Sequence, residues 1–109
     1  MASTCWKAEE RAAAKLLGGQ RYWANGGGRI DVESDRHVCQ VKHRRVCSLA
    51  ELERLALEME RLGTERGKVG LVIVKRRAGA GRPTPRLVIM TEDAYQVHCE
   101  PPAYPSASD

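Results

Sequence analysis

The chain has 109 residues, enough for one domain around a single hydrophobic core. Phenylalanine is absent, so leucine, valine, isoleucine and alanine must fill that core. Lysine and arginine exceed aspartate and glutamate by 18 to 14, an excess that indicates solubility but names no partner. The start shows no secretory signal and no apolar run is long enough to span a membrane, so we expect a cytoplasmic protein.

The four cysteines are spaced too irregularly for a zinc site, because none of them forms a Cys-x-x-Cys pair. In a reducing compartment we expect them to be mostly buried, inert thiols. A disulfide between Cys39 and Cys47 stays open as an alternative that we do not favour.

The first predicted element is a helix from Trp6 to Leu17, where alanine and leucine recur at helical spacing. Ser3 or Thr4 can cap its first turn. Gly18-Gly19 is the usual kind of helix end, because glycine adopts the left-handed backbone conformation readily.

Three strands in a meander are predicted next. They are rich in residues that favour β structure and are separated by turn residues. The strands cover residues 21–24, 29–33 and 36–43, with a glycine-rich turn at 25–28 and a hairpin turn at 34–35.

The clearest helix is predicted over Ser48–Leu62, with one leucine-rich stripe facing the core. Ser48 and Glu51 form a capping box, and Gly63 is expected to end the helix. A buried strand, an exposed loop, a further strand and a short helix follow, at Val69–Lys75, Ala78–Pro85, Arg86–Met90 and Thr91–Tyr95.

The order α-β-β-β-α-β-β-α predicts an α/β domain with a mixed five-stranded sheet flanked by helices. The Ser48 helix connects two strands as a crossover, which favours parallel pairing between them. We expect one domain over residues 1–99 and a disordered tail over residues 100–109, which are rich in proline and serine.

A candidate site joins two neighbouring predicted strands. Asp31 is expected inside the 29–33 strand, opposite Gln40 and Lys42, which share a face because strand side chains alternate. Carboxylate and amide oxygens bind Mg²⁺, and a lysine nearby can position water and offset phosphate charge. Each residue alone has an ordinary explanation in a turn or strand, but the set predicts a phosphodiesterase that uses Mg²⁺, or alternatively Mn²⁺.

Acidic residues elsewhere could complete such a site. Glu9 and Glu10 lie in the first predicted helix, where the helix dipole ordinarily explains acids, yet one of them could reach a metal at Asp31. Glu33 could add charge if its strand stays regular.

Basic residues gather in separate blocks, whereas acids concentrate in residues 51–65. Such segregation fits a face turned toward a polyanion. The candidate phosphate contacts are Arg11, Arg29, His43, Arg44, Arg45, Lys75, Arg76, Arg77, Arg82 and Arg86.

Three motifs, Glu10-Arg11, the glycine-rich run that ends in Arg29-Ile30-Asp31-Val32, and Gln40-Val41-Lys42-His43-Arg44, precede a long amphipathic helix. Together they resemble the PD-(D/E)xK nuclease superfamily, and within it the archaeal-type Holliday junction resolvases, including versions carried by bacteriophages. The resemblance runs from about Trp6 to Tyr95.

This resemblance implies a restriction-endonuclease-like fold, cleavage of four-way DNA junctions in recombination, a Mg²⁺ cofactor and a homodimer. It implies that Glu10 is the acidic residue of the first helix, Asp31 the metal-binding aspartate and Lys42 the catalytic lysine. Gln40 would be a metal ligand, although the family usually has a glutamate or aspartate there.

Three alternatives remain open. The chain could be another nuclease of the same superfamily that nicks DNA, cuts flaps or acts at transposon ends. It could be a catalytically silent DNA-binding module in which Gln40 marks a lost active site. It could also be a non-enzymatic α/β interaction protein.

Overall fold

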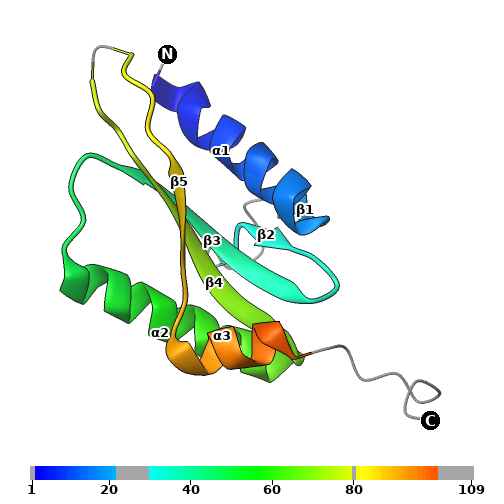
Figure 1. Cartoon of the computed structure of the whole chain (residues 1–109). Helices are drawn as coiled ribbons and strands as arrows, with labels where there is room; N and C mark the ends of the chain where they lie inside the picture. The colour runs from blue at the N-terminus through cyan, green and yellow to red at the C-terminus, as the bar shows by residue number, and fades with distance from the viewer. Residues whose placement is uncertain (1, 22–29, 80, 101–109) are drawn as a thin grey trace, which may run out of the picture.

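The computed structural model describes residues 2–21, 30–79 and 81–100, with side chains from Lys7 onward (Figure 1). Its elements are α1 (Ala2–Leu17), β1 (Gln20–Arg21), β2 (Val32–Glu33), β3 (His37–Arg44), α2 (Leu49–Arg66), β4 (Val69–Arg76), β5 (Arg86–Ile89) and α3 (Glu92–Cys99). The predicted order and the predicted α/β class are confirmed. The predicted turn at 25–28, the 22–24 part of the first strand, Arg29 and residues 101–109 of the expected tail lie outside the described residues.

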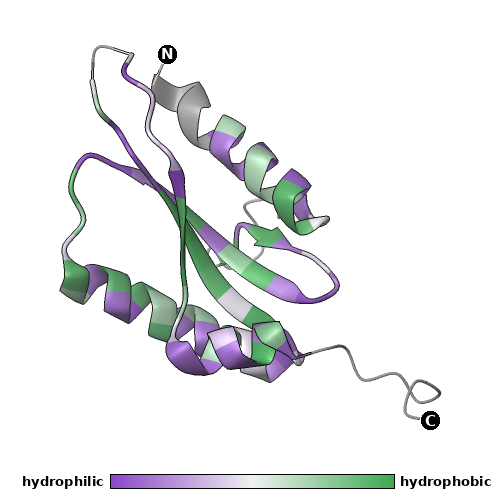
Figure 2. Cartoon of the chain, in the orientation of Figure 1, coloured by the Kyte–Doolittle hydropathy of each residue, from purple (hydrophilic) through white to green (hydrophobic). Residues whose placement is uncertain are grey.

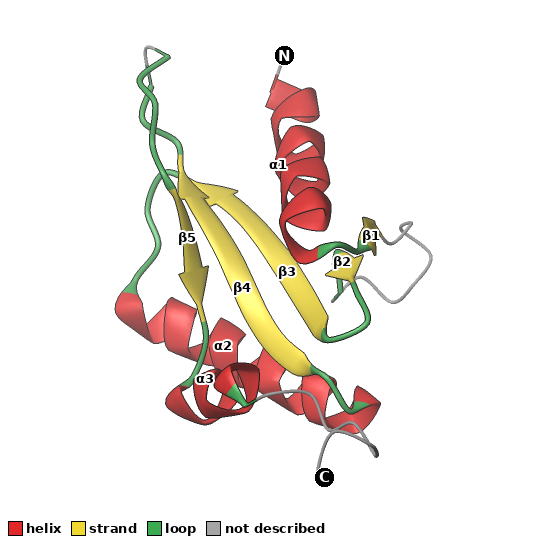
Figure 3. Ribbon diagram, turned by 45° about the vertical axis from the view of Figure 1, so that its right-hand side comes forward, coloured by secondary structure: helices red, strands yellow, loops and turns green. Residues whose placement is uncertain are grey.

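The five strands form one mixed sheet in the order β1-β2-β3-β4-β5 (Figure 3). β1, β2 and β3 pair antiparallel, β3 and β4 pair parallel through the α2 crossover, and β4 and β5 pair antiparallel. The parallel pairing predicted from the crossover is therefore confirmed. β4 lies between two strands and is buried from Val69 to Val74, as a strand covered on both faces should be.

Helices cover both faces of the sheet, with α1 on one face and α2 and α3 on the other (Figure 1). The core accordingly consists of two apolar clusters, one under α1 and one under α2. The first contains Ala13, Val32, Cys39, Leu71 and Ile73, and the second contains Ile30, Val38, Leu55, Met59, Val72 and Val74. Figure 2 shows the apolar residues running along β3 and β4 between the helices.

The prediction that Gly63 ends the second helix is wrong. α2 continues to Arg66, and Gly67 ends it in the left-handed conformation with φ at 70°. Gly63 instead lies where α2 approaches β4, and a Cβ there would press on the Lys68 carbonyl oxygen. A Cβ at Gly70 would overlap the backbone of α2, so these two glycines serve close packing.

Helix caps were predicted with mixed success. Ser48 and Thr91 cap α2 and α3, since their side chains accept hydrogen bonds from the backbone N–H of Glu51 and Ala94. α1 already begins at Ala2, so residues 3 and 4 are inside the helix and the cap predicted for them is wrong. α3 also runs on to Cys99, further than predicted.

The cysteines differ in their surroundings. Cys39 is a free, fully buried thiol, and its burial raises its pKa to about 12. Cys47 is half-buried and Cys99 exposed, both free, so the expectation of mostly buried thiols is wrong for Cys99. None of the described helices is both long and apolar enough to cross a membrane.

Candidate functional site

Asp31 lies on a bend next to β2, not inside a strand as predicted, because β2 contains only Val32 and Glu33. Its backbone N–H donates to the Cys39 carbonyl oxygen at 2.9 Å. Its carboxylate oxygen Oδ2 accepts the backbone N–H of Val41 at 2.8 Å. The Asp31 side chain therefore takes the place that a backbone carbonyl would occupy beside β3.

Gln40 lies next to this carboxylate. Val32 pairs with Cys39, so one further step in the same register places Asp31 opposite Gln40. The Gln40 side chain is nearly buried, and its Oε1 has no hydrogen-bond partner in the part of the chain that the structure describes. A buried acceptor without a partner costs about 1–3 kcal/mol, so this oxygen is open to a water molecule or a ligand.

Glu10 approaches Asp31 from α1. It is 7% exposed, and its Oε1 accepts a hydrogen bond from Arg21 Nε at 3.1 Å. Burial raises the pKa of Glu10, and the negative charge of Asp31 raises it further, against the lowering effect of Arg21. Because α1 begins at Ala2, Glu10 lies beyond the first two turns, and the helix dipole does not explain an acid there.

Lys42 completes the cluster from β3. Burial raises the pKa of Asp31, whereas the Val41 N–H and the ammonium of Lys42 lower it. Lys42 follows Gln40 at the alternate position of the same strand, so the two side chains share a face as predicted. The charge of Asp31 thus acts on Glu10, and the charge of Lys42 acts on Asp31. Gln40 shares with Val38 the face of β3 that lies under α2, whereas Glu10 lies on α1, which covers the other face.

The oxygen atoms of this region suit a hard divalent cation. Glu10 and Asp31 supply carboxylate oxygens and Gln40 an unpaired amide oxygen, the ligand type that Mg²⁺ takes. Among the described residues, no three or more His, Cys, Asp and Glu side chains form a group that could hold a metal, so this region offers no third carboxylate. Glu33 does not contribute, because Lys68 Nζ holds its carboxylate at 2.6 Å.

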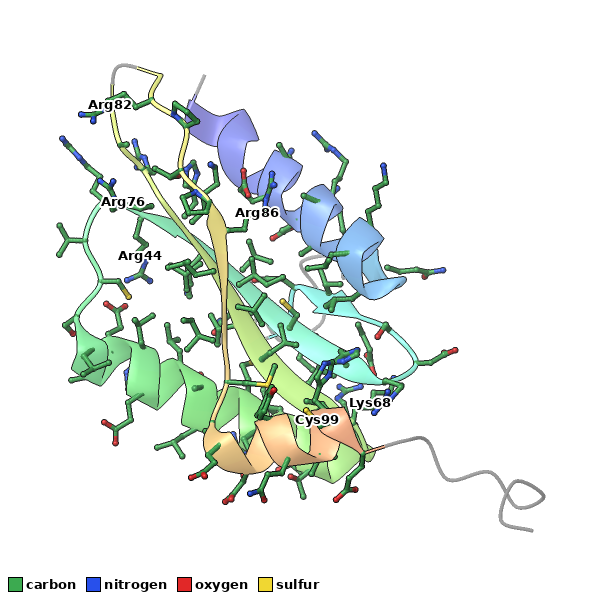
Figure 4. The ribbon with its side chains drawn as sticks, in the orientation of Figure 1. Arg44, Lys68, Arg76, Arg82, Arg86 and Cys99 are labelled. Atoms are coloured by element: carbon green, nitrogen blue, oxygen red, sulfur yellow. The ribbon has the colours of Figure 1, made fainter. Side chains whose placement is uncertain are left out.

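Glu9, the neighbouring acid of α1, has a different role. Its carboxylate is buried and pairs with Arg86 Nε at 2.6 Å. This pair ties α1 to the start of β5, and Figure 4 shows Arg86 pointing from β5 toward α1. Arg86, expected as a phosphate contact, therefore has a carboxylate partner within the protein.

A basic pocket lies beside the projecting connection between β4 and β5. It has a volume of about 250 Å³, and its lining includes His43, Lys75, Arg76, Arg77 and Arg82. The pocket joins two stretches that are far apart in sequence, and Figure 4 shows Arg76 and Arg82 at this end of the molecule. The pocket thus brings His43, from the first basic block, beside the block that begins at Lys75.

Two more of the predicted phosphate contacts, besides Arg86, have partners within the protein. Arg44 forms an ion pair with Glu51 of α2. Lys75 Nζ donates to the Thr84 carbonyl at 2.6 Å and to its hydroxyl at 3.0 Å, which braces the β4–β5 connection. Arg11 and Arg45 are exposed, as a phosphate contact requires.

Several contacts at or near the site have no signal in the sequence. The Arg21–Glu10 and Arg86–Glu9 pairs join residues 11 and 77 positions apart, and no local pattern links them. His37 and His98 are likewise far apart in sequence, yet His37 Nε2 lies 3.1 Å from His98 Nδ1.

Comparison of the chain with protein-family models, with curated proteins and with solved structures finds no match. The function must therefore be argued from the cluster at the β3 edge, the basic pocket and the sequence motifs.

Proposed function

We propose that this protein is a Mg²⁺-dependent, structure-selective endonuclease that cleaves branched DNA, as a Holliday junction resolvase does in recombination or phage DNA processing. One observation carries the proposal. Glu10 and Asp31, two carboxylates from different elements, lie close enough for the charge of Asp31 to raise the pKa of Glu10, and the ammonium of Lys42 acts on Asp31 in turn. Gln40, whose Oε1 has no partner among the described residues, follows the β3 residue that pairs with Val32, next to Asp31.

The chemistry follows from these groups. A bound Mg²⁺ would polarise the scissile phosphate and lower the pKa of the attacking water. Glu10, Asp31 and Gln40 would hold the ion through oxygen atoms. Lys42 would orient the water and offset the charge that develops on the phosphate.

The cation would also relieve the strain between the two acids. Burial and mutual repulsion raise the pKa of Glu10, and burial raises that of Asp31, so both ionised forms are disfavoured without a positive partner. Glu10 has Arg21 as a partner in the structure, and a metal would compete with that guanidinium.

Binding of DNA would use the exposed arginines around the basic pocket. Contacts to backbone phosphates orient a protein on DNA but carry no sequence information, which suits recognition of a branched shape. A four-way junction offers two equivalent phosphodiesters, and a two-fold symmetric homodimer would present two equivalent sites to them.

The proposal is tested with a synthetic four-way junction and Mg²⁺. We expect wild-type protein to cut it and Asp31→Asn and Lys42→Met to reduce the cleavage rate at least a hundredfold, the scale of losing a transition-state contact. Asp35→Asn, which alters an exposed aspartate in the β2–β3 turn, is the matched control and should cut normally. Equal rates in all four proteins, or no cleavage by the wild type, would refute the site.

The same assay with flap and linear duplex DNA separates a junction resolvase from other nucleases of the superfamily. Preferential cutting of the junction supports the resolvase. Preferential cutting of a flap or a linear end supports one of the alternatives.

A silent DNA-binding module is the second candidate, and the amide of Gln40 favours it. An amide oxygen contributes only a dipole to a metal site, where a carboxylate would contribute a full charge. Gln40→Glu separates the two candidates. Activity that appears only in this variant supports the silent module, whereas activity in the wild type supports the nuclease.

A further inference from the structure

Two of the three histidines of the chain face one another where α3 ends beside β3. His37 is the first residue of β3, and His98 lies in the last turn of α3. His37 Nε2 is 3.1 Å from His98 Nδ1, and the ring centroids are 5.2 Å apart. Figure 1 shows the end of α3 close to the start of β3. His43, the third histidine, lines the basic pocket near the opposite end of β3.

The separation of the two ring nitrogens suits a shared metal ion as well as a hydrogen bond. Imidazole nitrogens bind Zn²⁺ at about 2.0–2.1 Å, so two of them lie about 3.3 Å apart at a tetrahedral ion and about 2.9 Å apart at a right angle. The observed 3.1 Å falls between these values. An ion can therefore bind both nitrogens after a turn of the rings, with the separation of the nitrogens nearly unchanged.

Ser34 supports the ring of His37 from the other side. Its buried side-chain oxygen accepts the backbone N–H of His37 at 3.0 Å and lies 3.4 Å from His37 Nδ1. Metal binding at Nε2 requires the ring proton to be on Nδ1, from which it can donate to Ser34 Oγ. A partner of this kind fixes the tautomer and the orientation of a ligating histidine.

Hydrogen bonds also hold α3 in place. Arg36 Nη2 donates to the carbonyl oxygens of His98 and Glu100, at 3.3 Å in each case. At the start of α3, Thr91 Oγ1 donates to Glu60 Oε1 at 2.9 Å. Because both ends of α3 are fastened, binding of an ion to the two rings requires little further ordering of the chain.

The surroundings of the pair allow an ion to enter. Both histidines are half-buried, so the rings are open to solvent on one side. A ligating imidazole must be neutral. Burial, His98 and Arg36 lower the pKa of His37 below its ordinary value, which keeps that ring neutral near pH 7. The charge of Arg36 also opposes a cation, so we expect a moderate affinity.

We propose that His37 and His98 together bind a divalent transition-metal ion, Zn²⁺ above all, which fastens the end of α3 to the start of β3. Imidazole suits Zn²⁺, Cu²⁺ and Ni²⁺ rather than the hard Mg²⁺, so the site differs in chemistry from the region of Asp31. In the described part of the chain no third His, Cys, Asp or Glu completes a metal-binding group, so water takes the other positions. The site uses no cysteine, and it holds whether or not the protein cleaves DNA.

Isothermal titration calorimetry of the full, untagged chain with Zn²⁺ tests the proposal, in excess Mg²⁺ to occupy sites made of oxygen ligands. We expect one Zn²⁺ per chain for the wild type and no saturable binding for His37→Gln or His98→Gln over the same concentrations. His43→Gln is the matched control and should bind like the wild type. Cys99→Ser and Asp31→Asn should also bind like the wild type, because neither the exposed thiol nor the Asp31 region contributes.

Spectroscopy of the wild type does not depend on whether a variant folds. With Cu²⁺ as the probe, electron paramagnetic resonance should show coupling to two imidazole nitrogens. With Zn²⁺, nitrogen NMR should show shifted ring resonances for His37 and His98 and unshifted ones for His43.

Thermal denaturation followed by circular dichroism provides a third measurement and verifies that each variant is folded. Zn²⁺ should raise the Tm of the wild type and of His43→Gln, and it should leave the Tm of His37→Gln and His98→Gln unchanged. A wild type without saturable Zn²⁺ binding would overturn the proposal, because the two rings would then share only a hydrogen bond. So would binding that both His37→Gln and His98→Gln retain, or binding that is lost in Cys99→Ser.

Discussion

Replacing Gln40 by methionine should stabilise the protein without Mg²⁺ and destabilise it, relative to the wild type, when Mg²⁺ is present. The two side chains have similar length and no branch, so the substitution removes the polar atoms and keeps the volume. In the structure Gln40 is 8% exposed, pairs in register with the fully buried Val72, and leaves Oε1 without a partner among the described residues.

The magnitude follows from that unpaired oxygen. A buried acceptor left unsatisfied costs about 1–3 kcal/mol, and the lower end applies because the variant also loses the amide N–H groups. We therefore expect Gln40→Met to raise the free energy of unfolding by about 1 kcal/mol in EDTA. For a domain of this size that corresponds to a rise in Tm of about 4–8 °C.

With Mg²⁺ present, the wild type should become more stable than Gln40→Met. A ligand present at a hundred times its dissociation constant stabilises the folded state by about 2.7 kcal/mol. The wild type should gain this stabilisation, whereas the methionine variant, with one oxygen ligand fewer, should gain less. The wild type then becomes the more stable protein.

Thermal denaturation followed by circular dichroism, in EDTA and over a Mg²⁺ titration, measures both effects. Gln96→Met, at an exposed position of α3, is the matched control and should leave both unchanged. Lower stability of Gln40→Met in EDTA would show that the Gln40 oxygen is satisfied after all. An equal response of both proteins to Mg²⁺ would refute the role of Gln40 as a ligand.

Three further predictions concern the fold, its pH dependence and DNA binding. Gly70→Ala should lower the free energy of unfolding by about 1–3 kcal/mol, because the added Cβ would overlap the Met59 carbonyl of α2. Urea denaturation measures this loss, and an unchanged denaturation midpoint would contradict the close packing of α2 on Gly70. Burial and the neighbouring His98 lower the pKa of His37 below 6.5, so the unfolded chain binds the proton more readily than the folded one. The contribution of neutral His37 to the free energy of unfolding should be complete above pH 6.5 and should be lost as the pH falls below that value. Urea denaturation at several pH values should show this loss for the wild type and a smaller loss for His37→Gln. Arg82→Ala should weaken binding to a four-way junction. If Arg82 makes one phosphate contact, the slope of the logarithm of the binding constant against the logarithm of the salt concentration should fall in magnitude by about 0.9. Fluorescence anisotropy measures this slope, and an unchanged slope would show that Arg82 does not contact DNA.

The architecture could be predicted because its signals are local. The Ser48 and Thr91 caps join residues three positions apart, and the apolar run of β4 lies within one strand. A crossover helix between two strands restricts their pairing to parallel. Such patterns are present in any short window of the chain, so the class, element order and central strand could all be derived from it.

For the candidate site, the sequence could place two residues on one face of a strand but could not give the geometry around Asp31. Alternation along one strand is a local property, so Gln40 and Lys42 could be placed on one face. That Asp31 leaves the strand and accepts the Val41 N–H depends on how β2 ends against β3. The bend depends on pairing between separate segments, which no pattern within residues 29–33 encodes.

The long-range partners were decided by the tertiary structure alone. Arg21 pairs with Glu10 and Arg86 with Glu9 because packing of α1 on the sheet brings their side chains together. Gly63 reads locally as a helix end, yet the close approach of α2 to β4 requires glycine there and the helix continues past it. Local propensity specifies which segments become helices and strands, whereas burial and distance between segments determine which charges meet.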